Sequence, residues 1–325
     1  MTSVLFLGGT GTISSACVER AIESGHDVTV TTRGRSSRRP HPEARVLTTD
    51  VRRKGALSDI TRARSYDVVV DVLSFTADDV EAMADAVEGR CGQYVFLSSA
   101  TVYRRPPATL PVAESAPLGN THWEYARRKI RAEAALRARM DAGLPATIVR
   151  PSHTYDARRP VGLGGWTDMA RIRAGEPVLV HEDPTTLWTI THARDFALLF
   201  EPLLADERAI GGTFNVMGDE ALSWVEIYRA LAEALGVADV QLAPVSASII
   251  ADIDPVFGER VLGDHGCSMT FDTSAVRAIA SQASTTTPFS EGARQLAEAH
   301  LALPEGQQRD PSVDARIEAV LAAVV

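Results

Sequence analysis

The sequence predicts an α/β protein built on a doubly wound parallel sheet, followed by a smaller, irregular second domain. Three observations support this fold class. Short runs rich in valine and leucine alternate with longer amphipathic runs in the first half of the chain, a glycine-bearing turn follows the first apolar run, and the alternation degrades after residue 155. Apolar strands separated by helices indicate βαβ units, whose helices cover both faces of a parallel sheet.

The patterns define the elements of the first domain. Strands are expected at Ser3–Leu7, Asp27–Thr32, Arg45–Thr49, Asp67–Leu73, Gln93–Ser98 and Ala146–Arg150. Amphipathic helices are expected between them, among them Ile13–Ser24, Ala77–Val87 and Trp123–Ala142. These elements form a first domain over residues 1–160, and later strands near residues 188–216 are expected to return to it.

Residues 161–325 are expected to belong mainly to the second domain. Helices are expected at Trp166–Ala174, Ala193–Ala205, Trp224–Leu235, Pro288–Leu303 and Pro311–Val324. Short strands are expected at Val178–Val180 and Thr213–Val216. The sequence contains no internal repeat and no low-complexity segment, so a solenoid or a disordered region is not expected.

The composition excludes several classes of protein. The net charge of −9 argues against a general nucleic-acid binder, because phosphate neutralisation needs concentrated lysine and arginine. The three cysteines form no CxxC pair, so neither a zinc site nor a disulfide framework is expected. No segment approaches the roughly 20 apolar residues of a membrane span, and no secretory signal pattern begins the chain. We therefore expect a cytoplasmic protein without membrane or nucleic-acid partners.

The turn Gly8–Gly11 directly follows the first strand and directly precedes a helix. Gly8 permits the tight turn, and Gly11 lets the backbone approach a pyrophosphate. The helix then directs its unpaired N–H groups and the positive end of its dipole at the anion. Ser14 replaces the usual third glycine and is small enough for close helix–strand packing. We expect NAD or NADP to bind here, with contacts from Gly8, Thr10, Gly11, Thr12 and Ile13.

The end of the second strand selects between the two cofactors. An acidic residue there would bind the ribose 2′-hydroxyl, but this sequence has Arg33, followed by Arg35. A guanidinium can bind a 2′-phosphate through two hydrogen bonds, so the sequence favours NADP and leaves NAD open. Asp50 and Val51, after the third strand, are expected to meet the adenine ring.

Tyr125 and Lys129 lie four residues apart in a helical pattern and therefore share one helix face. Free tyrosine titrates near pH ~10, and a neighbouring ammonium group favours the phenolate. Such a tyrosine can take the proton of a carbinol while a hydride leaves for the nicotinamide. Ser99, at the end of the fifth strand, can orient the same oxygen. A YxxxK pair alone is common by chance. Here it follows a glycine loop and a serine at a strand end, in that order, and this combination is much more specific for the chemistry described.

The glycine loop and the set of Ser99, Tyr125 and Lys129 together point to a known family. Three further motifs agree with it: Asp50, Arg150-Pro151 and Phe214-Asn215-Val216. The chain resembles the extended short-chain dehydrogenase/reductase family, in the branch of NAD(P)-dependent sugar epimerases and dehydratases. The resemblance implies a Rossmann domain followed by a substrate-binding domain. Relatives often dimerise through the two long helices bordering the sheet, which makes a homodimer through Ala77–Val87 and Trp123–Ala142 one expectation.

The resemblance also implies roles for individual residues. Ser99 corresponds to the catalytic serine, Tyr125 to the acid/base, and Lys129 to the residue that lowers the tyrosine pKa and holds the nicotinamide ribose. The segment Ser98–Tyr103 is similar to that of UDP-galactose 4-epimerases. Because it lacks the two acids that 4,6-dehydratases of the family usually carry there, a dehydratase of that kind is disfavoured.

Candidate substrate residues follow from the same alignment. Trp188 stands where relatives have an arginine that holds the diphosphate of a sugar nucleotide, and Arg260 corresponds to a second such arginine. An indole offers a stacking face for a sugar or base, although Trp188 would serve equally as a core residue. His153 aligns with a pocket asparagine and suits either a second acid/base or a fixed hydrogen bond. The remaining pocket candidates are Thr101, His192 and Tyr103, which is expected to face the substrate.

The sequence favours an enzyme that transiently oxidises a carbinol of a sugar or sugar-like substrate, including a nucleoside. Epimerisation or dehydration would follow before the hydride returns. An NADPH-dependent ketone reductase or dehydrogenase with net redox turnover is an alternative, which Arg33 and Arg35 favour. A non-catalytic dinucleotide-binding regulatory protein is another, and the intact Ser99, Tyr125 and Lys129 set argues against it.

Overall fold

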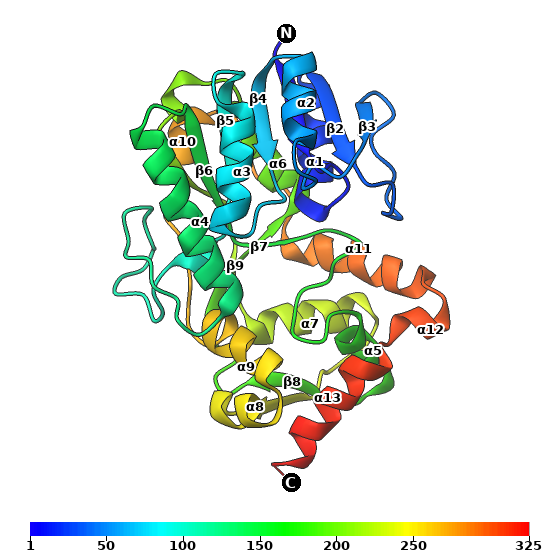
Figure 1. Ribbon diagram of the computed structural model, residues 1–325. Helices are drawn as coiled ribbons and strands as arrows, with labels where there is room; N and C mark the ends of the chain where they lie inside the picture. Colours follow the sequence, from blue (N-terminus) through cyan, green and yellow to red (C-terminus); the bar gives the residue numbers. More distant parts are fainter. Residues whose placement is uncertain (325) are drawn as a thin grey trace.

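The computed structural model describes residues 1–324 and confirms the predicted fold class. Seven parallel strands form the main sheet in the order β10-β6-β5-β4-β1-β2-β3 (Figure 1). Their bounds are β1 Ser3–Leu7, β2 Asp27–Thr32, β3 Arg45–Thr48, β4 Tyr66–Asp71, β5 Cys91–Leu97, β6 Ala146–Pro151 and β10 Thr213–Val216. The strand order reverses between β1 and β4, and doubly wound sheets bind their ligands in the crevice at such a reversal.

Helices cover both faces of this sheet (Figure 1). One face carries α1 (Thr12–Glu23), α6 (Ala193–Phe200) and α10 (Ser274–Ile279), and the other carries α2 (Ala56–Ala63), α3 (Ala77–Val87) and α4 (Glu124–Asp141). Each face of the sheet has its own apolar core, and alternate side chains of β1 point into one or the other. Val4 and Phe6 pack under α1, and Leu5 and Leu7 pack under α3 and α4. Because such a strand is buried on both faces, it reads as a continuous apolar run.

The strand β9 (Leu187–His192) corrects the expected boundary between the domains. It pairs with β7 (His153–Tyr155) on one edge and with β11 (Ala221–Ser223) on the other, forming a separate three-stranded sheet. Since both of its edges are occupied, β9 has none to offer the main sheet. Of the segment 188–216, only β10 joins that sheet, and α6 packs on its face.

The second domain surrounds its own core, which contains Trp188, Trp224 and Tyr228. Its other elements are α5 (Trp166–Ala174), β8 (Val178–His181), α7 (Trp224–Ala234), β12 (Leu242–Val245), α8 (Ala247–Ile253), α9 (Pro255–Arg260), the π-helical turn η4 (Val261–His265), α11 (Phe289–Ala302), α12 (Glu305–Gln308) and α13 (Pro311–Ala322). The predictions missed the short elements between residues 242 and 265. No helix within residues 1–324 is long and apolar enough to cross a membrane.

A buried ion pair fastens α4 to β6. Arg150 donates to Glu133 through Nη2 at 2.6 Å and through Nε at 2.9 Å, and both side chains are 1% exposed. Ser98 Oγ also donates to Glu133, at 2.6 Å. Arg150 Nη1 donates to the hydroxyl of Tyr103 at 2.8 Å, and that hydroxyl donates to Asn215 Oδ1 at 2.6 Å. This network joins α4 to the ends of β5, β6 and β10.

We predict that Glu133→Gln destabilises the protein strongly. The substitution removes the charge that balances the buried guanidinium of Arg150, and breaking such a pair costs about 3–5 kcal/mol. Thermal and urea unfolding followed by circular dichroism measure the loss. Glu124→Gln is the matched control on the same helix, because its arginine partners lie at the surface and exposed pairs contribute little. An unfolding midpoint of Glu133→Gln equal to that of the control would contradict this role for the network.

Candidate active site

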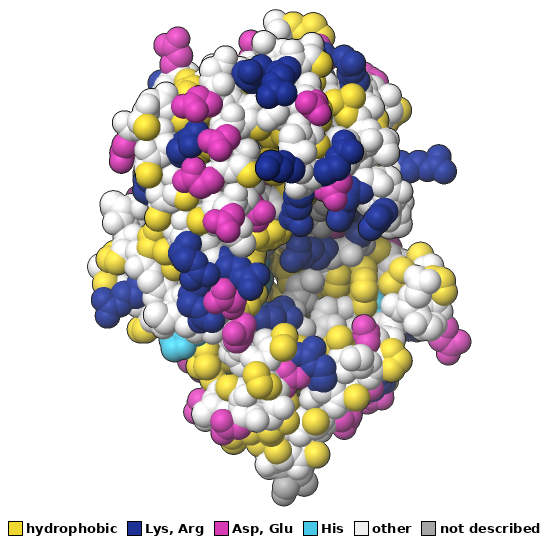
Figure 2. Space-filling view, in the orientation of Figure 1, with side chains coloured by type: hydrophobic (Ala, Val, Ile, Leu, Met, Phe, Trp, Pro, Cys, Tyr) yellow, Lys and Arg dark blue, Asp and Glu magenta, His cyan; other side chains and the backbone are white. Residues whose placement is uncertain are grey.

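A cavity of about 730 Å³ lies at the carboxyl ends of β1, β4, β5 and β6, where the second domain meets the sheet. The predicted residues Ser99, Tyr125 and Lys129 all line it, together with Gly11 and its neighbours in the glycine loop. The space-filling view shows the molecule hollowed between its two parts, with lysine and arginine side chains gathered above the hollow (Figure 2). The strand-order reversal therefore leads to one cavity that holds both the glycine loop and the candidate catalytic residues.

Lys129 is buried, and two backbone carbonyls hold its ammonium group. Nζ donates to Ser74 O at 2.8 Å and to Leu97 O at 2.7 Å. It also lies 4.8 Å from the ring centroid of Phe75 and 4.6 Å from that of Phe96, where cation–π attraction is favourable. An ammonium has three N–H donors, so one remains for a ligand.

Asp71, which ends β4, shapes the loop that receives this ammonium. Its Oδ1 accepts the N–H groups of Leu73 at 2.8 Å and Ser74 at 3.0 Å, and its Oδ2 accepts the hydroxyl of Tyr94 at 2.5 Å. Burial lowers the pKa of Lys129 to about 8, although nearby carboxylates, Asp71 first among them, raise it. The sequence reasoning missed Asp71, whose signal was an acid directly at the end of an apolar strand.

Tyr125 occupies the first turn of α4, with its ring centroid 5.0 Å from that of Trp123. Burial raises the pKa of Tyr125, while a hydrogen bond with Ser99 lowers it in part. Ser99 precedes the 3-10 turn η1 (Ala100–Val102), and its Oγ accepts hydrogen bonds from Thr101 N at 3.2 Å and Thr101 Oγ1 at 2.9 Å. The hydroxyl hydrogen of Ser99 is therefore available to donate to the phenolic oxygen. Thr101, another predicted residue, lines the same cavity.

The glycine loop has the shape that a dinucleotide requires. Gly8 adopts a φ of +87°, a conformation that favours glycine. A Cβ at Gly9 would lie 2.8 Å from the side chain of Val30 on β2, so the loop can pack this closely only without a side chain. These constraints explain why glycine occupies both positions of the turn between β1 and α1. The loop residues thus fit a nicotinamide dinucleotide.

Ser14 does more than replace the third glycine. Its Oγ accepts the N–H of Gly11 at 3.0 Å and so occupies one of the amide groups that an anion could use. The N–H groups of Thr12 and Ile13, in the first turn of α1, have no acceptor within the helix. They are the backbone donors through which the loop would hold a pyrophosphate.

A second cavity, of about 270 Å³, lies beyond the ends of β2 and β3. It brings together the residues predicted for the adenosine end of the cofactor: Gly8, Thr10, Arg33, Asp50 and Val51. Arg35 and Arg52 line it as well, and Arg52 was not predicted. Asp50 is the one carboxylate in this described lining, and its Oδ1 accepts the backbone N–H of Arg52 at 3.1 Å.

Besides Thr101, two further substrate candidates, His153 and Arg260, line the main cavity. His153 does so with Nε2 2.5 Å from Asp264 Oδ2, a partner that the sequence reasoning missed. Arg260 donates to the carbonyls of Gly162 and Leu163, both at 2.9 Å, and so holds the loop that forms the cavity wall. Much of its hydrogen-bonding capacity is therefore committed within the protein.

Tyr103 departs from the expectation that it faces the substrate, whereas Trp188 takes the core position that was one of its two expected roles. Both are 1% exposed in the core of the second domain, and neither lines the cavity. The hydroxyl of Tyr103 is committed to Arg150 and Asn215, as described above. The indole of Trp188 packs beneath the guanidinium of Arg105, 4.9 Å from its carbon to the ring centroid. Pairing of β9 on both edges holds this side chain inward.

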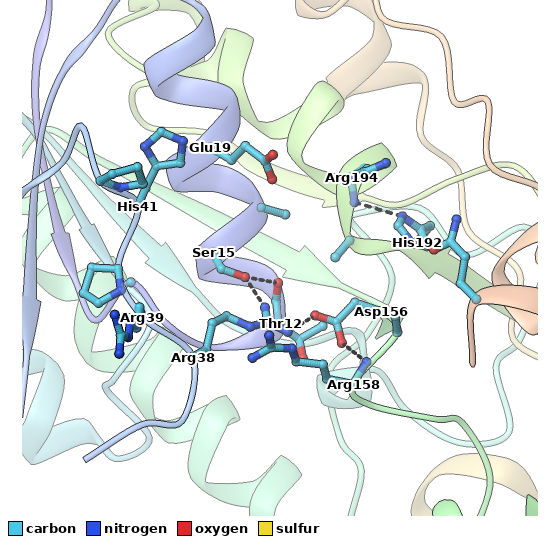
Figure 3. Close-up of a pocket in the computed structure, with 17 residues that line it drawn as sticks. Thr12, Ser15, Glu19, Arg38, Arg39, His41, Asp156, Arg158, His192 and Arg194 are labelled. Atoms are coloured by element: carbon cyan, nitrogen blue, oxygen red, sulfur yellow. Dashed lines mark hydrogen bonds and ion pairs between the residues drawn. The ribbon is translucent and has the colours of Figure 1, made fainter. Parts of the chain in front are cut away.

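His192 also lies outside the main cavity. It lines a separate cavity of about 390 Å³ beside α1, where its Nε2 lies 3.1 Å from Gln295 Oε1 (Figure 3). Its Nδ1 accepts the N–H of Arg194 and caps α6. In the same cavity, Arg38 reaches Ser15 and Asp156. The geometry thus gives His192 a capping role.

Comparison with known proteins agrees with this architecture. Residues 4–216 match the model of the NAD dependent epimerase/dehydratase family. The fold is similar to that of UDP-glucose 4-epimerase from Bifidobacterium longum, solved in complex with NAD+ and UDP. The TM-score is 0.74 and the identity 19%, and the match covers 94% of this chain and 100% of that chain.

Two curated proteins are similar in sequence. The 2′-dehydrokanamycin reductase of Streptomyces kanamyceticus is 29% identical over 244 residues, covering 72% of this chain. The chloroplast stem-loop binding protein of 41 kDa b of Arabidopsis thaliana is 26% identical over 257 residues, covering 74% of this chain. The chain spans 66% and 65% of the lengths of these relatives. Because the family model matches from β1 to β10, the chain belongs to the NAD dependent epimerase/dehydratase family.

Proposed function

We propose that the chain transiently oxidises a carbinol of a sugar or sugar-like substrate and completes an epimerisation or dehydration before reducing it again. The observation that carries this proposal is that Ser99, Tyr125 and Lys129 line one cavity with the glycine loop. When bound there, a nicotinamide dinucleotide supplies a reversible hydride acceptor. The substrate would enter from the side of the second domain.

The chain's own groups then have separable tasks. Tyr125 takes the proton of the substrate hydroxyl. Ser99 donates a hydrogen bond that keeps the substrate oxygen next to the phenolic oxygen of Tyr125. Because burial raises the pKa of Tyr125, its phenolate needs nearby positive charge. Arg159 already lowers this pKa, and we propose that Lys129, one helical turn further along α4, adds to this charge and directs its remaining N–H toward the nicotinamide ribose.

The cavity at the adenosine end supports NADP as the cofactor. Arg33 and Arg35 line it at the end of β2, where an enzyme selective for NAD would present a carboxylate. A 2′-phosphate there would receive charge-assisted hydrogen bonds. Asp50 already accepts the N–H of Arg52, so its carboxylate is partly engaged.

We predict that the double substitution Arg33→Ala and Arg35→Ala lowers the affinity for NADPH by about 10²- to 10⁴-fold, since each of two hydrogen bonds to a charged group contributes about 1.5–3 kcal/mol. The affinity for NADH should change little, because NADH lacks the phosphate. Cofactor fluorescence titration measures both constants. Arg62→Ala, an exposed arginine on α2, is the control. Equal losses for the two cofactors would contradict the assignment of the phosphate site.

Net reduction of a ketone is the second candidate function. The arginine-lined cavity favours it, because NADP commonly serves net reductions. The Streptomyces relative is named as a reductase of 2′-dehydrokanamycin, and the same Ser99, Tyr125 and Lys129 set would protonate the nascent alkoxide. This candidate shares the catalytic residues of the first and differs in whether the cofactor is released after each turnover.

A non-catalytic role is the third candidate, and the Arabidopsis relative is named as a stem-loop binding protein. The acidic net charge of −9 and the assembled catalytic residues speak against such a role here. Replacement of Tyr125 separates a catalytic from a non-catalytic function.

We predict that Tyr125→Phe lowers turnover by about 10²- to 10⁴-fold, the usual contribution of a proton-transfer group, while NADPH still binds. UDP-glucose, UDP-galactose and 2′-dehydrokanamycin are the test substrates, followed by product analysis and by nicotinamide absorbance. Tyr66→Phe is the matched control, since Tyr66 is buried at the opposite end of β4. Activity that survives in Tyr125→Phe would refute the catalytic assignment.

We also predict that affinity for NADPH falls as the pH rises through about 8, the pKa of Lys129. Below this pH the ammonium has three donors, two on Ser74 and Leu97 and one for the cofactor. Above it the neutral amine keeps only two, which the carbonyls occupy. Fluorescence titration between about pH 7 and pH 9.5 measures the change. A constant affinity over this range would show that the third donor does not serve the cofactor.

A further inference from the structure

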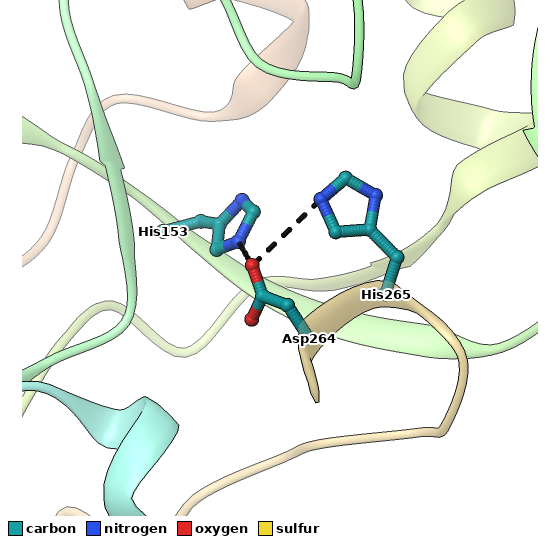
Figure 4. Close-up of side chains that lie close together, drawn as sticks. All are labelled: His153, Asp264 and His265. Carbon is teal, nitrogen blue, oxygen red and sulfur yellow. Dashed lines mark hydrogen bonds and ion pairs between the residues drawn. The ribbon is translucent and has the colours of Figure 1, made fainter. Parts of the chain in front are cut away.

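The strongest unassigned feature is the side chain of His153, at the start of β7. It lines the main cavity together with Tyr125, although the two residues come from different elements. Its side chain is 19% exposed, whereas that of its partner Asp264, in η4, is 3% exposed. Figure 4 shows the carboxylate of Asp264 between the imidazoles of His153 and His265. Both residues line the cavity, and Asp264 is the more buried of the two.

The carboxylate of Asp264 is held as an anion. Burial alone would raise the pKa of Asp264, but the imidazole of His153 and the guanidiniums of Arg105 and Arg260 lower it below its usual value. Arg105 Nη1 donates to the backbone carbonyl of Asp264 at 3.0 Å, and its Nη2 lies 3.5 Å from Oδ1. Oδ2, the other oxygen, is the one that meets His153.

Aromatic side chains fix the plane of the His153 ring. Trp188 contacts it edge to face, with 4.9 Å between ring centroids and an angle of 86°, and Trp224 and His265 lie at 5.8 Å and 5.3 Å. With the ring held and Nε2 on Asp264, the proton of a neutral imidazole is placed on Nε2. Nδ1 then carries a lone pair, which the contact of Nε2 with Asp264 leaves unengaged. This is the tautomer that a proton acceptor needs.

We propose that His153, oriented by Asp264, is a second proton-transfer group of the active site and acts on a carbon next to the oxidised carbinol. This inference rests on the proposed function, because a ketone must form before its neighbouring C–H becomes acidic. Nδ1 of His153 takes that hydrogen as a proton, the C–H electron pair becomes the enolate, and the imidazole becomes an imidazolium. Asp264 stabilises this cation and is the positioning residue.

The imidazolium can then return its proton in two ways. Returned to the same carbon from the same face, the proton restores the ketone with its configuration unchanged, and it can exchange with solvent while it is on the imidazole. Donated to a hydroxyl one carbon further along, it releases water and leaves an unsaturated ketone, so the proton and the hydroxide together account for the water lost. Both outcomes require a substrate that is a ketone with a hydrogen on the adjacent carbon, as oxidised sugars are.

The same residues have the composition of a metal site, because a nitrogen of His265 lies near Asp264 Oδ2, at 3.7 Å. Two features favour the proton-transfer pair. Arg105 and Arg260 both lower the pKa of Asp264, so they already supply positive charge that would repel a divalent cation. His153 is also at hydrogen-bond distance from the carboxylate, without room for an ion between them.

The test isolates the proton step from the hydride step. The enzyme loaded with NADP+ is incubated in D2O with 2′-dehydrokanamycin, a ketone that oxidised cofactor cannot reduce, and deuterium at the carbons next to the ketone is measured by mass spectrometry. We expect exchange above the buffer rate in the wild type and a loss of about 10²- to 10⁴-fold in His153→Gln. Asp264→Asn, which keeps the shape without the charge, should lose at least about 10-fold while still binding NADPH.

His26→Gln is the matched control, because His26 forms a similar partly buried pair with Glu201, at 2.9 Å. This pair lies just beyond the carboxyl end of α1, whereas the glycine loop precedes its amino end. The control variant should exchange like the wild type. Tyr125→Phe should keep most of the exchange but lose reduction of the same ketone by NADPH. If Tyr125→Phe still reduces the ketone, the proposed function fails, whatever the exchange shows.

Three results would overturn the role of His153. They are a wild type that gives no exchange above buffer, a His153→Gln variant that exchanges like the wild type, and a stoichiometric metal ion found by elemental analysis whose removal abolishes exchange. The third would assign the cluster to a metal instead.

Discussion

The buried ammonium of Lys129 connects the elements that make up the site. Its two carbonyl partners belong to different strand ends, Leu97 at the end of β5 and Ser74 in the loop after β4. A charge in this position is costly unless its donors are satisfied, so the helix α4 can dock only in the register that brings Nζ to both carbonyls. That register places Tyr125, one turn earlier, at the mouth of the cavity beside Ser99.

A second buried pair reinforces the same docking from behind. Glu133, one turn beyond Lys129 on α4, meets Arg150 of β6, and the network continues through Tyr103 to Asn215 of β10. The motifs around Arg150 and Asn215 that suggested the family therefore act in this structure as a frame for the catalytic helix. The chemistry lies at the strand ends, and the frame keeps those ends in place.

The sequence predicted most of the sheet and the core of the site because these depend on local patterns. Buried parallel strands read as apolar runs, and the spacing of Tyr125 and Lys129 is a property of one helix. The failures involve contacts between distant segments. The strand β9 was misplaced because no local signal shows that both of its edges are paired, and Asp264 was missed because it lies 111 positions from His153 within short, weakly periodic elements.

In the proposed reaction, the cofactor is restored in place within each turnover. The most direct test follows the absorbance of reduced nicotinamide through a complete reaction of the cofactor-loaded enzyme with its accepted substrate. We expect product to form in large excess over the enzyme, with no net change in the amount of reduced cofactor. Stoichiometric consumption of NADPH with each product molecule would contradict it and assign the chain to net ketone reduction.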